Sequence, residues 1–85
     1  MEYVIVAFRS RAHTVSFSDY LRKFGLQNEI VNTPKEAGVG CGLSVKVSKT
    51  ALSSVKRAAY AFNASSFAGF FVIKVYGNQR LVKSI

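Results

Sequence analysis

A single cysteine, Cys41, is the residue whose surroundings are best suited to chemistry. It stands between Gly40 and Gly42, and a third glycine, Gly38, precedes them. Glycines adopt backbone conformations that other residues resist, so this segment can leave the sulfur unhindered and neighbouring N–H groups free to converge on an anion. A thiolate needs access and positive potential, and it is the nucleophile that such a turn would present.

The alternative interpretation of Cys41 is a small buried side chain that packs and takes no part in chemistry. A glycine on each side argues against a core position, where bulky neighbours in regular structure are usual. Lys35 and Lys46 are close to Cys41 in the sequence, and their charge would favour a thiolate if they are also close in space. The residues by themselves support the structural and the reactive interpretation about equally.

Other kinds of catalytic centre find little support among the titratable residues. The chain has one cysteine, one histidine (His13) and four acids, and these form no cluster at the spacing of a zinc site. The acids are dispersed, so a pair of carboxylates for acid–base catalysis is not expected. A dyad of Cys41 with His13 stays open, since both would lie near one end of a sheet. We therefore predict no metal and no cofactor.

Size and composition predict one small domain spanning residues 1–85, because 49% of the residues are hydrophobic and disorder requires far fewer. The longest apolar stretch, near Phe67–Val75, is interrupted by Gly69 and Lys74 and is much shorter than the roughly 20 residues of a spanning helix. The first residues do not resemble a secretory signal, and a lone cysteine cannot form an internal disulfide. We therefore expect a cytoplasmic protein without membrane contact.

The chain carries a net charge of +8, and its isoelectric point is near 10.1. Such a charge attracts polyanions, including nucleic acid and acidic proteins. The basic residues are scattered, which is typical of a solvated basic surface. An RNA-recognition module stays an alternative. The nearest counterpart of its aromatic motif, Phe67–Lys74, lies on the last predicted strand and not on the third, so a role in the core is expected there.

Hydrophobic periodicity predicts four strands and two helices in the order β-α-β-β-α-β. The predicted strands are Glu2–Phe8, Asn28–Asn32, Leu43–Ser48 and Phe67–Tyr76, and the predicted helices are Arg11–Phe24 and Ala51–Phe62. Two helices of this spacing can pack on one face of a four-stranded antiparallel sheet, so the expected fold is an α+β, ferredoxin-like sandwich. The tail Gln79–Ile85 can add a short strand.

Local signals predict where these elements end and which way they face. Ser10 is placed to cap the first helix, and Gly25 is placed to end it in a left-handed conformation. The first strand is apolar on both faces, as expected of a central strand that is covered on one side and partly shielded on the other. In the third strand, alternation directs Val45 and Val47 inward and Ser44 outward.

The segment around Cys41 resembles the signature of a known family. Thr-Pro-Lys at residues 33–35 is followed by Cys-Gly-Leu-Ser at residues 41–44. These are similar to the Thr-Pro-Arg/Lys and Cys-Gly-Leu/Ile-Ala/Ser motifs of the small bacterial Se/S carrier protein-like domains. The resemblance extends in length and pattern over nearly the whole chain. It implies that the cysteine carries sulfur or selenium as a persulfide or a selenosulfide.

On this resemblance, Cys41 accepts and carries the sulfur or selenium atom, supported by the loop residues Thr33, Pro34, Lys35, Gly40 and Gly42. The implied partners are a protein donor and a protein acceptor, because the chain has no second cysteine to resolve a persulfide. The domain would act as a carrier and not as a turnover enzyme, and a homodimer formed through the sheet is compatible with the topology. The alternatives are a basic RNA-binding module and a small interaction or effector-binding domain.

Overall fold

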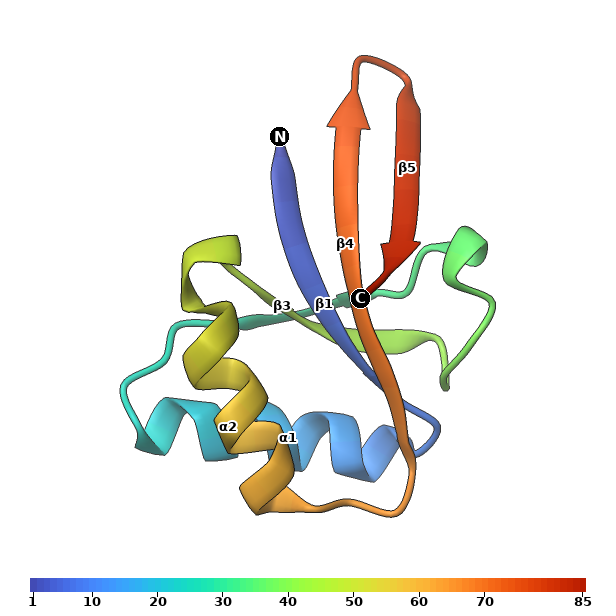
Figure 1. Cartoon of the computed structure of the whole chain (residues 1–85). Coiled ribbons are helices and arrows are strands. Elements are labelled where there is room, and N and C mark those ends of the chain that lie inside the picture. Colours follow the sequence, from blue (N-terminus) through green and yellow to red (C-terminus); the bar gives the residue numbers. More distant parts are fainter.

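The computed structural model describes residues 1–85 as a sheet packed against two helices (Figure 1). The strands are β1 (Glu2–Phe8), β2 (Glu29–Asn32), β3 (Leu43–Val47), β4 (Phe67–Tyr76) and β5 (Gln79–Ser84). The helices are α1 (Arg11–Lys23) and α2 (Leu52–Phe62), and two short 3-10 turns are η1 (Lys35–Ala37) and η2 (Lys49–Ala51). None of the helices is both long enough and apolar enough to cross a membrane.

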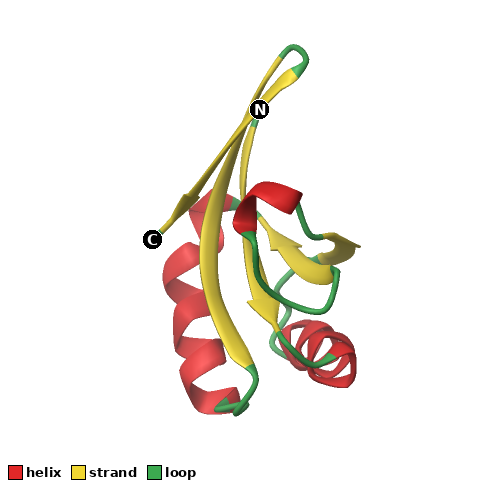
Figure 2. Cartoon of the chain, turned by 90° about the vertical axis from the view of Figure 1, so that its right-hand side faces the viewer, coloured by secondary structure: helices red, strands yellow, loops and turns green.

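The strands form one antiparallel sheet in the order β2-β3-β1-β4-β5, with β1 at its centre. The expected ferredoxin-like sandwich is matched only roughly, because the sheet has five strands and not four. A turn at Gly77, where φ is 56°, returns the chain, and β5 pairs with the second half of β4. This pairing satisfies the outer backbone groups of β4, which explains why the tail forms a full strand. The turn stands clear of both helices (Figures 1 and 2).

Both helices contribute to the same hydrophobic core on one face of the sheet. The buried members of this core are Val4, Val6, Phe8, Phe17, Leu21, Val45, Val47, Val55, Ala58, Phe70 and Val72. Phe8 lies among aromatic rings, with its centroid 5.2 Å from that of Phe17, 5.9 Å from that of Phe62 and 5.8 Å from that of Phe67. Tilted and edge-on contacts of this kind stabilise beyond the apolar area that they bury.

The opposite face of the sheet holds a smaller core of Ile5, Ala7, Phe71 and Ile73. Ala37 and Val39, from the connection between β2 and β3, pack against these residues. This arrangement confirms that β1 is a central strand with apolar residues on both faces. It also confirms the core role of the aromatic segment in β4, since Phe70 and Phe71 are buried.

Ser44 departs from the expected pattern, because it is fully buried although alternation directs it away from the helices. It lies opposite Ala7 in the sheet register, on the face that the β2–β3 connection covers. Its hydroxyl is 2.7 Å from the hydroxyl oxygen of Thr33, so the two share a hydrogen bond. Alternation identifies which face a residue occupies, but it does not tell whether a loop from elsewhere covers that face.

The ends of the helices follow the local signals, with small shifts. The Ser10 hydroxyl accepts a hydrogen bond from the N–H of His13 and caps α1, and Gly25 follows the helix with φ 73°. Phe24, predicted as the last helical residue, is the C-cap and is largely exposed. α2 begins at Leu52 and not at Ala51, because η2 occupies the preceding three residues.

We expect replacement of Phe8 by alanine to lower the free energy of unfolding by about 3–5 kcal/mol, because it leaves a cavity among three aromatic rings. The matched control is Tyr60→Ala, since Tyr60 is 73% exposed and its loss should change stability by only about 0.5 kcal/mol. Urea denaturation followed by circular dichroism measures both. Equal effects of the two substitutions would contradict the placement of Phe8 at the centre of the core.

Candidate functional site

The connection between β2 and β3, residues 33–42, is closed at its base and presents Cys41 near its end. The Thr33 N–H donates a hydrogen bond to the Gly42 carbonyl oxygen at 2.9 Å. Pro34 (φ −58°) leads into η1, and Gly38 ends η1 in the left-handed conformation. The segment is therefore a closed loop with its own short helical turn, and we refer to residues 33–42 as the thiol loop.

The thiol loop is attached to the end of β1 through Cys41 itself. The N–H of Cys41 donates to the carbonyl oxygen of Phe8 at 3.2 Å. The flanking residues Gly40 and Gly42 both have φ 95°, which side-chain-bearing residues rarely adopt. A Cβ on Gly40 would also lie 3.2 Å from the Phe8 carbonyl oxygen, whereas one on Gly42 would meet nothing within 4 Å. Both positions therefore require glycine for the positive φ, and position 40 also requires it because a side chain would crowd the Phe8 carbonyl oxygen.

The Cys41 side chain is half-buried and contacts two oxygen atoms. Its Sγ lies 3.7 Å from the hydroxyl oxygen of Thr14 and 3.7 Å from the carbonyl oxygen of Leu43. Thr14 belongs to the first turns of α1 and is itself fully buried, and its hydroxyl lies 3.0 Å from the Ser10 carbonyl oxygen, to which it donates. A thiol can donate to either oxygen, and a thiolate can accept a hydrogen bond if the Thr14 hydroxyl turns toward it.

Sequence reasoning missed Thr14, although one signal for it was present. Thr14 lies three and seven residues before Phe17 and Leu21, so it occupies the buried face of α1. A polar residue on an otherwise apolar helix face requires a partner when it is buried. The pattern therefore pointed to a polar contact at this position, but it could not identify the sulfur, which lies 27 residues away in the chain.

The proposed dyad with His13 receives no support from the geometry. The Nδ1 atom of His13 is 2.5 Å from the hydroxyl oxygen of Ser66, with which it shares a hydrogen bond. No hydrogen bond joins His13 to Cys41, whose polar side-chain contact is Thr14. No group of three or more potential ligands could hold a metal ion.

The two lysines near Cys41 in the sequence have different surroundings. Lys46 points to the other end of the sheet, where its Nζ atom is 3.4 Å from the Glu29 carboxylate and 4.6 Å from the Tyr3 ring centroid. Lys35 forms no ion pair, and no hydrogen bond joins it to Cys41. It lines an open depression together with Arg9 and with residues of the thiol loop that include Thr33, Pro34, Gly40 and Gly42.

A bidentate ion pair anchors the middle of the thiol loop to β5. The guanidinium group of Arg80 donates to the two carboxylate oxygens of Glu36 at 2.9 and 3.3 Å. These hydrogen bonds hold the pKa of Glu36 below its usual value, with smaller help from a backbone hydrogen bond and from the charges of Arg80 and Lys35. The contact joins residues 44 positions apart in the chain.

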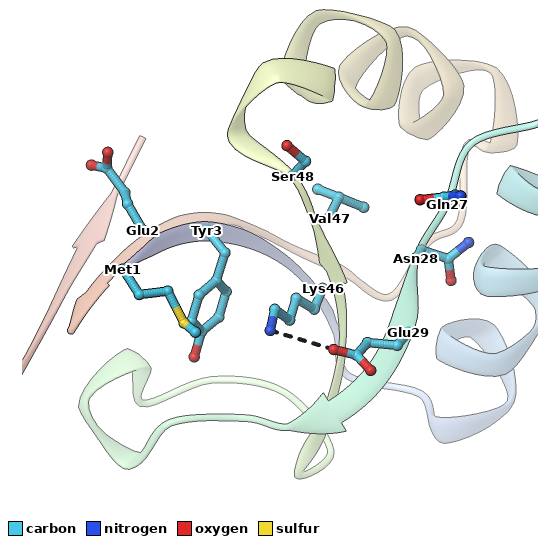
Figure 3. Close-up of a pocket in the computed structure, with 9 residues that line it drawn as sticks. All are labelled: Met1, Glu2, Tyr3, Gln27, Asn28, Glu29, Lys46, Val47 and Ser48. Carbon is cyan, nitrogen blue, oxygen red and sulfur yellow. Dashed lines mark ion pairs between the residues drawn. The ribbon is translucent and has the colours of Figure 1, made fainter.

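Figure 3 shows a second hollow, lined by Met1, Glu2, Tyr3, Gln27, Asn28, Glu29, Lys46, Val47 and Ser48. It lies at the start of β1, whereas Cys41 is attached to the end of that strand. The seven residues of β1 separate the two places by about 20 Å of extended chain. The charges at this hollow are already paired, since Glu29 contacts Lys46, and Glu2 contacts Lys49 and Lys74. It is therefore separate from the thiol, and each charged side chain that lines it is in an ion pair.

The glycines on either side of Cys41 predict a graded response to substitution. We expect Gly42→Ala to lower the free energy of unfolding by about 1–2 kcal/mol, because alanine resists a positive φ. Gly40→Ala should cost more, because its Cβ also presses on the Phe8 carbonyl oxygen. Thermal and urea denaturation of both variants would test this order. A Gly40→Ala variant as stable as Gly42→Ala would contradict the close approach.

The ion pair on the thiol loop predicts a specific titration. In Arg80→Ala, we expect the pKa of Glu36 to rise toward its usual value, while the low pKa of Glu2, set first by its hydrogen bond to Lys49, should not change. Because the folded-state pKa of Glu36 is the lower one, its stabilising effect is present above the unfolded-state pKa and is lost as pH falls through the folded-state pKa. NMR titration of the carboxyl carbons measures both groups. An unchanged pKa of Glu36 would show that Arg80 does not hold it.

Comparison of the sequence with known proteins identifies the family of this chain. A search of curated proteins and a search of solved structures gave no match. A family model described as "Putative Se/S carrier protein-like" matches residues 2–65, which include the whole thiol loop and end just before β4. The match covers most of the chain and agrees with the family that the motifs around Cys41 resemble. The chain therefore belongs to the Se/S carrier protein-like family.

Proposed function

We propose that the protein carries sulfur or selenium on Cys41, as a persulfide or a selenosulfide, and passes it from a donor protein to an acceptor protein. Membership in the Se/S carrier protein-like family is the observation that carries this proposal. Cys41 is the only residue of the chain able to hold the atom in this form, since the chain has one cysteine. The location would be cytoplasmic, where thiols stay reduced.

The transfer step is an exchange at a sulfur atom. The Cys41 thiolate attacks the terminal sulfur of a persulfide on the donor, R–S–SH. A sulfur–sulfur bond to Cys41 forms while the bond within the donor persulfide breaks, and the donor cysteine leaves as a thiolate. The product is a persulfide on Cys41, and no external oxidant or reductant is needed. A selenosulfide donor, R–S–SeH, reacts in the same way.

The surroundings of Cys41 support such a step in three respects. Cys41 is a half-buried residue and not a core one, and the exposed Gly40 and Gly42 present no side chain that would hinder a donor loop. The Thr14 hydroxyl, which donates to the Ser10 carbonyl oxygen, lies 3.7 Å from the sulfur and can turn to donate to a thiolate. The attachment to Phe8 holds the Cys41 backbone, so the sulfur has a defined place.

The remaining loop residues have supporting roles in this proposal. Thr33 closes the thiol loop through its hydrogen bond to Gly42, and Pro34 leads into η1. Lys35 and Arg9, in the depression beside the loop, add positive potential for an incoming anion. The chain has no second cysteine, so the persulfide cannot be resolved internally and must leave to a partner. The net charge of +8 favours partners with an acidic docking surface.

The direct test is the intact mass of the protein after incubation with a cysteine desulfurase and cysteine, without reductant. We expect a gain of one sulfur atom that reductant removes and that is absent in Cys41→Ser. Circular dichroism of Cys41→Ser should match the unchanged protein, because the substitution keeps the size of a half-buried side chain. No gain of mass in the folded protein, together with failure of the thiol to react with an alkylating reagent, would overturn the carrier proposal.

A second variant, Thr14→Val, tests how the thiolate is supported. Valine has the shape of threonine but cannot donate a hydrogen bond, so we expect slower alkylation of Cys41 at neutral pH. The matched control is Thr50→Val, because Thr50 is exposed and its hydroxyl contacts Ser48 and not the thiol loop. An unchanged rate in Thr14→Val would remove Thr14 from the proposal and leave the role of Cys41 intact.

A further inference from the structure

Seven of the twelve basic side chains have no carboxylate partner. Each of the four acids forms an ion pair, and together they engage Arg22, Lys46, Lys49, Lys74 and Arg80. The remaining cations are in no ion pair: Arg9, Arg11, Lys23, Lys35, Lys56, Arg57 and Lys83. These side chains are therefore the ones available to an external anion.

Two of these cations, Arg9 and Lys35, line the same depression. Arg9 follows β1 and Lys35 begins η1, so the depression joins segments that are distant in the sequence. Its volume is about 550 Å³, and no acid lines it. An arginine and a lysine that line one depression, with no carboxylate among the lining residues, give it positive potential.

Backbone donors are also free at this depression. Val39, Gly40 and Gly42 line it, and their N–H groups donate to no acceptor within the chain, whereas the N–H of Cys41 is bonded to Phe8. The sign of φ alternates along residues 38–42, since the three glycines are positive and the residues between them are not. Because the N–H groups of Gly38 and Cys41 are bonded to Lys35 and Phe8, the free donors are the consecutive pair at Val39 and Gly40 and the separate one at Gly42, and backbone donors of this kind contribute partial positive charge to an anion site.

We propose that this depression binds a tetrahedral oxyanion, a phosphate or sulfate group, beside the thiol loop. A carboxylate has two oxygens, whereas Arg9, Lys35 and three free N–H groups supply more donors than two oxygens can accept. A tetrahedral anion has oxygens in several directions and can engage both side chains and the backbone. The site does not require the sulfur of Cys41, so it stands independently of the carrier role.

The test is an NMR titration of the ¹⁵N-labelled protein with inorganic phosphate at constant ionic strength, with sodium chloride as the balancing salt. We expect saturable shifts of the amide signals of Val39, Gly40 and Gly42. The double variant Arg9→Ala with Lys35→Ala should weaken binding roughly tenfold or more, because it removes two charge-assisted contacts. Lys83→Ala removes an equally unpaired cation from β5 and should leave the affinity unchanged.

Two further arms sharpen the result. Methyl phosphate tests whether the ligand is a free ion or a phosphoryl group on a larger molecule. Because the depression is open, we expect the ester to bind about as well as phosphate, whereas loss of binding would restrict the site to the free ion. Cys41→Ser should bind phosphate like the unchanged protein, so failure of the carrier proposal would not remove this one. Where the double variant fails to fold, Lys35→Gln alone carries the test, with dispersed amide signals as proof of folding.

The proposal is overturned by shifts that do not saturate, by shifts spread over the basic surface, or by equal affinity in the double variant and in Lys83→Ala. Each of these results would assign the interaction to general counterion attraction. Saturable binding that is confined to the loop and lost in the double variant would establish the site.

Discussion

The carbonyl end of β1 is the point on which the rest of the arrangement depends. The Phe8 side chain lies among three aromatic rings in the helix-covered core, and its carbonyl oxygen accepts the N–H of Cys41. One residue therefore joins the helix-covered core to the thiol loop. Since Gly40 must pass within van der Waals distance of the same oxygen, the sequence around the cysteine is constrained by the strand beneath it.

The thiol loop has two functions in the fold, and they are coupled. Ala37 and Val39 cover the second face of the sheet, and Arg80 holds Glu36 at the middle of the loop. Lifting the loop would expose apolar side chains such as Ile5 and would also break a bidentate ion pair. The loop is thus ordered by burial at its centre and leaves its glycine-rich end open to solvent, which is where a reactive sulfur can be reached.

The ion pairs determine which basic side chains remain unpaired at the surface. The acids are all occupied by internal ion pairs, so the excess of positive charge falls on side chains that face solvent. At the thiol loop, two such cations and residues with free backbone donors line one depression, while the sulfur contacts Thr14 on the side of α1. Carrier chemistry and anion binding therefore use neighbouring but different groups.

Local features of this protein could be predicted from the sequence, because they depend on nearby residues. The cap at Ser10, the stop at Gly25 and the central position of β1 each follow from a short pattern, as does the glycine-rich turn around Cys41. Only the tertiary structure decided which distant groups meet. The burial of Ser44, the contact of Thr14 with the sulfur and the Glu36–Arg80 ion pair each join segments that no periodicity relates. Packing brings these groups together, and packing depends on the whole chain at once.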